Sequence, residues 1–172
     1  MRKSVLATAA AAGALAAAVV SPSVSSAVPT TVTFTVNGGP LTITAPQNQP
    51  LTVTGNTASG DITPVTVSDQ RAGINGWTAT AVSTAFTKPA PDPSSIPATA
   101  VTYSAPLLPD RTGVSTVAGI VVPQVIDTTK NVVAATAVLG RNTATWAGTV
   151  TVSLPGEVLA GTYTGVVTHS VA

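Results

Sequence analysis

The sequence predicts an all-β protein, an antiparallel β-sandwich of jelly-roll or immunoglobulin-like type with about nine or ten short strands. Valine and threonine recur in alternating runs, and their β-branched side chains suit a pleated strand better than a helix. Glycine, proline and asparagine separate these runs at short intervals, as turns do. The 172 residues, 44% of them hydrophobic, are enough for one domain with its own core.

The first 27 residues have the pattern of a secretory signal peptide. Arg2 and Lys3 supply the positive start, residues 5–20 form an apolar stretch, and Ala27 ends a run of small residues that a signal peptidase accepts. An uncleaved membrane anchor is the alternative, because the apolar stretch is only slightly shorter than the roughly 20 residues that span a bilayer. We therefore expect residues 28–172 to form one exported domain, with no membrane contact after cleavage.

Few residues carry charge, and this limits the classes of molecule that the domain can bind. Only 8% of the residues are charged, and without the signal peptide five Lys and Arg residues remain against six Asp and Glu residues. A nucleic-acid-binding domain needs a basic surface, so this class is excluded. The chain has no cysteine, so the exported domain depends on its hydrophobic core without disulfides.

The N-terminal part predicts two antiparallel strand pairs. Residues 31–36 alternate between apolar residues and threonines, and residues 37–40 (Asn-Gly-Gly-Pro) have the composition of a tight turn. Residues 41–45 are therefore expected to pair back onto residues 31–36. Residues 51–54 and 63–69 predict the second pair across another turn-rich segment.

The stretch 65–83 is the centre of the predicted fold. It reads as two alternating segments joined by a Gly/Asn turn, and Trp77 begins the second segment. Period-two alternation places Trp77, Ala79 and Ala81 on one face. Four prolines in residues 88–97 predict a surface loop, because proline disfavours both a helix and a central strand.

The remaining strands follow at regular spacing. An apolar, β-branched stretch covers residues 114–126, and Pro123 marks an edge or bulge. Residues 131–139 favour a strand that ends in a turn over a helix, because no capping pattern flanks them. Residues 149–154 and 162–171 complete the prediction.

No group of residues predicts catalysis. His169 is the only histidine. In a strand it lies on the same face as Tyr163, Val167 and Val171, so we expect His169 to be a core or edge residue. The carboxylates are scattered, and neither a nucleophile elbow, a metal-ligand spacing nor a phosphate loop is present. The prediction is a protein that is not an enzyme and has no cofactor.

Asp69 and Arg71 stand two residues apart before Trp77. The simpler interpretation is a local ion pair or Asx turn that fixes the connection between two strands. The alternative is a ligand site in which Arg71 and an exposed Trp77 contact a sugar or peptide, with Trp146 and Tyr163 extending the surface.

Two segments resemble the WxL domain family of bacterial surface proteins. The first, residues 68–81, contains Asp69-Gln70-Arg71, a glycine-rich turn and Trp77, and the second, residues 150–168, contains Gly161-Thr162-Tyr163. The sequence departs from the family pattern at three positions. Ala79 stands where the first Trp-x-Leu motif has leucine, and His169 and Val171 replace the tryptophan and leucine of the second.

The resemblance implies an extracellular domain that attaches noncovalently to the bacterial cell wall. Peptidoglycan or another envelope glycan is then the expected partner, together with other surface proteins. Two alternatives remain open: a structural subunit that adds edge strands to other surface proteins, and a secreted carbohydrate-binding module. The candidate ligand-binding or wall-binding residues are Asp69, Arg71, Trp77, Ala79, Tyr163, His169 and Val171.

Overall fold

The computed structural model describes residues 28–172, and the predicted signal peptide in residues 1–27 lies outside this range. The chain divides into two units, Met1–Phe34 and Thr35–Ala172, which are described separately. In the first unit, residues 28–34 are exposed and belong to no strand or helix. Within the described range no helix has the length and apolar character needed to cross a membrane.

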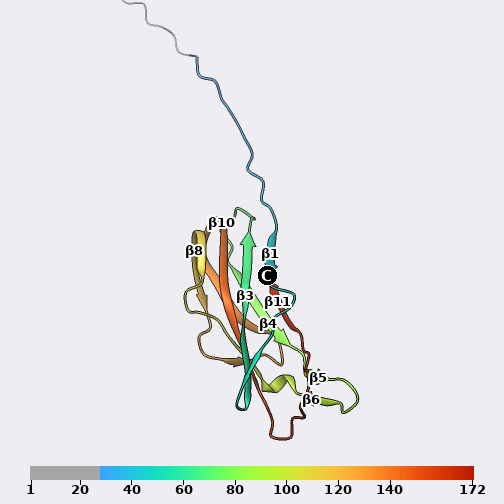
Figure 1. The fold of residues 1–172 in the computed structure, drawn as a ribbon. Helices are drawn as coiled ribbons and strands as arrows, with labels where there is room; N and C mark the ends of the chain where they lie inside the picture. The colour runs from blue at the N-terminus through green and yellow to red at the C-terminus, as the bar shows by residue number, and fades with distance from the viewer. Residues whose placement is uncertain (1–27) are drawn as a thin grey trace, which may run out of the picture. The chain divides into compact units, whose positions relative to one another are not determined.

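The second unit confirms the all-β prediction. Nine strands form one antiparallel sheet that nearly closes into a barrel-like sandwich, and two more form a small separate sheet (Figure 1). A short 3-10 helix, η1 (Ala98–Ala100), precedes β7. The strands are β1 (Leu41–Thr44), β2 (Thr52–Thr54), β3 (Thr57–Asp69), β4 (Trp77–Ser83), β5 (Phe86–Lys88), β6 (Ser94–Ile96), β7 (Val101–Ser104), β8 (Asp110–Gly119), β9 (Gln124–Val125), β10 (Lys130–Ser153) and β11 (Val167–Val171).

Strand β10 is the centre of the sheet. Its first half pairs with β4 and β8, and its second half pairs with β3, with the start of β8 and with β7. The sequence predicted two short strands here, separated by a turn at Gly140 and Asn142. That prediction is wrong, because Gly140 bends the strand at a φ of 74° without ending it and Asn142 is buried.

The two halves of the stretch 65–83 do not pair with each other. Strand β10 lies between β3 and β4 in the sheet, so the connection at residues 70–76 crosses over β10 and is not a hairpin turn. The predicted face of β4 is confirmed. Trp77, Ala79 and Ala81 are all buried, and the threonines between them are only partly buried.

The predicted hairpin at residues 31–45 is wrong. Residues 31–36 form no strand, and β1 pairs with the end of β3, where Leu41 lies opposite Asp69. The turn glycines instead allow a close approach to the chain that follows β3. Gly39 donates its amide to the carbonyl of Gln70 at 2.6 Å, and a Cβ at Gly38 would overlap the carbonyl of Arg71.

Three other predictions need correction. The proline-rich segment 88–97 is not wholly a loop, because β5 and β6 pair across it. The apolar stretch 114–126 splits into the end of β8 and the short β9. In the predicted strand 162–171 only β11 is regular, and the residues before it make a single bridge between Thr164 and Thr87.

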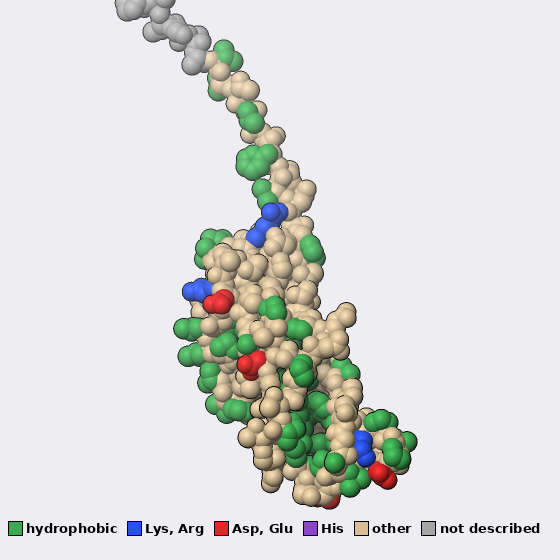
Figure 2. Space-filling view, in the orientation of Figure 1, with side chains coloured by type: hydrophobic (Ala, Val, Ile, Leu, Met, Phe, Trp, Pro, Cys, Tyr) green, Lys and Arg blue, Asp and Glu red, His purple; other side chains and the backbone are tan. Residues whose placement is uncertain are grey.

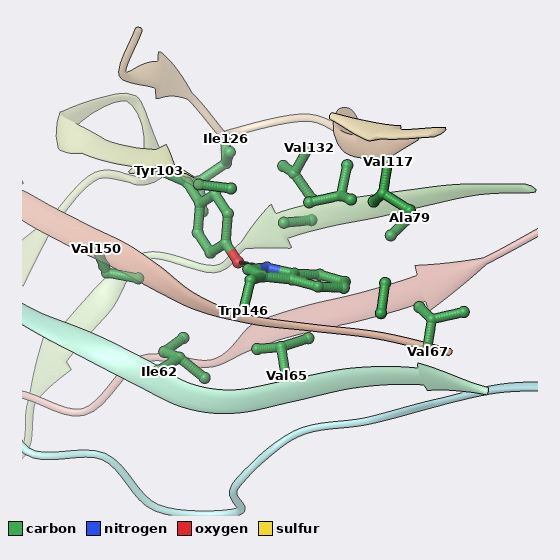
Figure 3. Packing of buried hydrophobic residues seen from close by; sticks show 14 of the residues in the cluster. Ile62, Val65, Val67, Ala79, Tyr103, Val117, Ile126, Val132, Trp146 and Val150 are labelled. Atoms are coloured by element: carbon green, nitrogen blue, oxygen red, sulfur yellow. Dashed lines mark hydrogen bonds between the residues drawn. The ribbon is translucent and has the colours of Figure 1, made fainter. Parts of the chain in front are cut away.

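The core lies between the faces of the nearly closed sheet. Figure 3 shows the Trp146 ring with Val65 on one side and Tyr103 on the other. Every second residue from Val65 to Asp69 is buried, and so is every second residue from Asn142 to Val152, as expected for strands that turn one face inward. Gly148 is required here, because any side chain at this position would overlap the Tyr103 ring.

Candidate functional site

The Asp69–Arg71 pair fixes the connection that leads into β4. Arg71 donates from Nε to Asp69 Oδ1 at 2.9 Å and from Nη2 to Asp69 Oδ2 at 3.0 Å. The same Nη2 also donates to the backbone carbonyls of Asn75 and Gly76, at 3.1 and 3.0 Å. The hydrogen bonds from Arg71 hold the pKa of Asp69 below its usual range. The interpretation as a local ion pair is confirmed.

The network continues into the core through Asn142. Its Nδ2 donates to Asp69 Oδ2 at 3.2 Å, and its Oδ1 accepts the indole N–H of Trp77 at 3.0 Å. Trp77 is only 2% exposed. The expectation that Trp77 offers an exposed face to a ligand is therefore wrong, because the ring packs into the core and its one polar group is satisfied by Asn142.

The strands that hold the WxL-like motif positions, β4 with Trp77 and Ala79 and β11 with His169 and Val171, lie side by side. Strand β11 pairs antiparallel with β4, with Val171 opposite Ala79 and His169 opposite Ala81. Ala79 is fully buried, and Val171 is partly buried against the same core, so both are packing residues in this fold.

His169 belongs to a second polar group, in which Tyr103 and Trp146 are buried and His169 is partly buried. The Trp146 indole N–H lies 3.0 Å from the Tyr103 hydroxyl oxygen, and His169 Nε2 lies 3.1 Å from the same oxygen. Because indole can only donate, the Tyr103 hydroxyl accepts from Trp146 and is free to donate its own proton to His169. Burial lowers the pKa of His169 to about 4 and raises the pKa of Tyr103 to about 12, so both are neutral near pH 7.

A groove opens beside this group, between the chain around the start of β2 and the chain that leads into β11. A smaller cavity of about 150 Å³, lined by His169, Ile62 and Val150, adjoins a larger one of about 810 Å³. We call the larger cavity the seam groove. It is lined by residues 47–51, Val53, Ala58, Phe86, Ile96, Val152, Leu154 and residues 158–165.

The floor of the seam groove is apolar and its rim is polar but uncharged. Ala58, Ile96 and Val152 on the floor belong to the core, and Gln47 and Gln49 are exposed on the rim. In Figure 2, hydrophobic side chains gather at the end of the domain where β5 and β6 lie. The groove can therefore hold an extended ligand by apolar contact and by amide hydrogen bonds.

Two aromatic side chains stand in the seam groove. Tyr163 is partly exposed and donates its hydroxyl to the carbonyl of Leu159 at 2.9 Å. Phe86 packs over Gly165, where a Cβ would lie 2.7 Å from the ring. These rings are available for stacking in a way that the buried Trp77 is not.

No match to this chain was found among protein-family models, curated proteins or solved structures. Within residues 28–172, no three His, Cys, Asp or Glu side chains gather as a group that could hold a metal ion.

The predicted site residues therefore fall into two places. Asp69, Arg71, Trp77 and Ala79 lie at the start of β4, with Val171 paired to Ala79. His169 and Tyr163 lie toward the other end of β4 and line the cavities there, where Val167 pairs with Ser83. The structure does not bring these residues together into one site.

Sequence reasoning missed the residues that connect these groups. Gly140 and Asn142 have the composition of a turn, and nothing local distinguishes Asn142 from a turn residue. No pattern in the sequence singled out Tyr103 or the groove residues Gln47 and Phe86. The signal that could have indicated Tyr103 is indirect: Gly148 is a glycine in the middle of a strand, which often marks close packing.

Proposed function

We propose that this chain is a secreted, non-enzymatic surface domain that associates noncovalently with the bacterial cell wall, in the manner of the WxL family. The observation that carries the proposal is the seam groove, where Tyr163 and Phe86 stand above an uncharged lining. The signal pattern in residues 1–27 and the two segments that resemble WxL motifs support export and a location on the cell surface.

The proposed ligand is peptidoglycan or another envelope glycan. Sugar rings have apolar faces that stack on aromatic side chains, and their hydroxyl groups pair with amides such as those of Gln47 and Gln49. An uncharged groove suits such a ligand better than it suits a nucleic acid. The aromatic contact is thus assigned to Tyr163 in place of the buried Trp77.

A pull-down on purified peptidoglycan tests this proposal. The wild-type protein is expected in the bound fraction at both low and high salt, because no ion pair is invoked. Tyr163→Ala should weaken binding about fivefold, since one aromatic contact is worth roughly 1 kcal/mol. Tyr163→Phe keeps the ring and should bind like the wild type.

Thr116→Ala on β8 serves as the matched control, because Thr116 is exposed and does not line the groove. Recovery of the wild-type protein wholly in the unbound fraction at both salt concentrations would exclude wall binding. Equal binding by Tyr163→Ala and the wild type would place any wall contact outside the seam groove.

A second candidate function is a structural subunit that associates with other surface proteins by adding strands. The observation that favours it is an unpaired backbone edge beside the groove. The amides and carbonyls of Tyr163 and Gly165 have no hydrogen-bond partner among the described residues. Size-exclusion chromatography with light scattering tests it, and a strict monomer with no partner recovered from culture would contradict it.

A secreted carbohydrate-binding module is the third candidate. It differs from the first in that its ligand is a soluble or foreign glycan and not the wall. A glycan array separates the two, because a wall-specific domain should bind only peptidoglycan fragments on it. An array without any signal would remove this candidate.

A further inference from the structure

The segment before the domain has the pattern of a strand without a partner. Val32, Phe34 and Val36 alternate with threonines, which is the pattern of a strand that buries one face. All three are instead exposed, Phe34 at 87%. No residue from 28 to 38 has a backbone hydrogen bond to another described backbone group. We call residues 31–36 the N-terminal segment.

The seam groove has the complementary property, an apolar surface without a cover. Its floor consists of core side chains such as Ala58 and Val152, and Leu51 and Leu154 flank them. None of its lining residues is charged, and the N-terminal segment carries no charge either. Association of the two therefore buries apolar surface without desolvating a charged residue of the groove lining or of the segment.

The groove also offers a backbone edge to a strand. Thr164 exchanges two hydrogen bonds of 3.0 Å with Thr87, so its amide and carbonyl point toward β5. In an extended chain the neighbouring peptide groups point the opposite way, which directs those of Tyr163 and Gly165 away from β5. These two residues have no partner among the described residues, and their spacing is that of a strand ladder.

The free edge of β8 is less suited to pair with an added strand than the edge at Tyr163 and Gly165. Two of its first residues, Asp110 and Arg111, are charged, and the Arg111 guanidinium donates to the carbonyl of Ser115 in the same strand. Charged residues and occupied backbone groups are devices that protect an edge strand from pairing. The edge at Tyr163 and Gly165 has neither.

The N-terminal segment is too short to reach the groove floor of its own molecule. Gly39 is held by the carbonyl of Gln70, just beyond the end of β3. Ala58 lies eleven residues before Asp69 on β3, which is about 36 Å in a strand. Phe34 is five residues from Gly39 and can extend at most about 18 Å from it.

We propose that the N-terminal segment of one copy adds as a strand to residues 162–166 of a second copy and places Val32, Phe34 and Val36 over the seam groove. The inference rests on the second candidate function, the addition of strands to other proteins. It names the strand that is added, the edge that receives it, and a second copy of this chain as the partner. Donor and acceptor are different surfaces, so the contact is head-to-tail and produces rings or open chains of subunits.

Light scattering on the protein purified after expression of the full chain tests the assembly. The wild-type mass should rise with concentration in multiples of the monomer. The triple variant Val32→Thr, Phe34→Thr and Val36→Thr should stay monomeric at every concentration. It should still fold, because these positions lie outside every strand. A monomeric wild type, or a triple variant that still assembles, overturns the proposal.

A mixing experiment tests the direction of the contact. Leu159→Asp places a charge in the groove at an exposed position and should also give a monomer. Mixing it with the triple variant restores one intact donor and one intact groove, so a dimer and nothing larger should form. Val114→Asp on β8 is the control and should assemble like the wild type. Assembly lost in Val114→Asp but kept in Leu159→Asp would assign the contact to β8 and overturn the proposal.

Cysteine cross-linking tests the register, since the chain contains no cysteine of its own. Thr35→Cys protein mixed with Thr164→Cys protein should form a disulfide-linked heterodimer, because paired strands bring Cβ atoms within disulfide range. Thr33→Cys covers a register shifted by two residues. Thr35→Cys mixed with Thr116→Cys on β8 should not cross-link, and equal cross-linking there would overturn the proposal.

Failure of the assembly proposal can be distinguished from failure of the wall-binding proposal. The triple variant leaves the groove open, so it should bind peptidoglycan at least as well as the wild type if Tyr163 contacts glycan. Loss of assembly with retained wall binding supports both proposals. Assembly without any wall binding supports this inference alone.

Discussion

Acidification from about pH 7.5 to about pH 4.5 is expected to destabilise the domain through His169. This imidazole is partly buried against the core, and its Nε2 is 3.1 Å from the Tyr103 hydroxyl. The two rings meet edge to face, with centroids 5.4 Å apart. None of the described salt bridges or hydrogen bonds joins His169 to a carboxylate that would stabilise its charged form.

The size of the effect follows from the pKa of His169. Burial lowers this pKa to about 4 in the folded protein, from 6.5 in an exposed histidine. Between these values the unfolded chain binds a proton that the folded chain does not, so stability is complete above pH 6.5 and falls as the pH drops toward 4. The loss by pH 4.5 is roughly 2 to 3 kcal/mol.

Urea unfolding followed by tryptophan fluorescence measures this loss, because both Trp77 and Trp146 are buried. His169→Gln keeps a polar group beside Tyr103 and removes the titration, so its stability should change little over the same pH range. The hydrogen bonds from Arg71 lower the pKa of Asp69, so the stability from its ion pair is lost only at a pH more acidic than this range. A wild-type protein with equal stability at both pH values, or an equal loss in His169→Gln, would refute the reasoning.

Two further predictions concern packing and the ion pair. Gly148→Ala should cost about 3 kcal/mol in urea unfolding, because the new methyl group overlaps the Tyr103 ring, whereas Gly156→Ala meets no atom within 4 Å and should be nearly neutral. Asp69→Ala should lower the free energy of unfolding by about 2 kcal/mol and alter the fluorescence of Trp77, because it leaves Asn142 without one hydrogen-bond partner. Asp110→Ala, at an exposed position, is the control and should do neither. An unchanged unfolding midpoint for either Gly148→Ala or Asp69→Ala would contradict the corresponding contact.

Alternation predicted which residues face inward but not which strands pair. The buried face of β4 was predictable because side chains alternate in any strand, whatever its neighbours are. The hairpin expected at residues 31–45 failed because a turn-forming sequence states only that the chain can bend there. Gly38 and Gly39 serve a close approach to Gln70 and Arg71, which are about 30 residues away in the sequence.

The candidate site shows the same division. Asp69 and Arg71 are two residues apart, so their ion pair was open to local reasoning. The partner that buries Asp69 is Asn142, which is 73 residues away and has the composition of a turn residue. The sequence allowed Trp77 as a ligand contact, because the local pattern around a tryptophan in a strand is the same whether that face of the strand is buried or exposed.

The sequence by itself determined the all-β class, the inward face of the main strands and the local ion pair, because each depends on residues that are close along the chain. Only the tertiary structure decided that β10 is one long central strand, that Trp77 is core, and that a groove opens beside Tyr163. Each of these features depends on contacts between strands that are distant in the sequence. The free energy of those contacts comes from many strand pairings, and no single segment of the sequence specifies them.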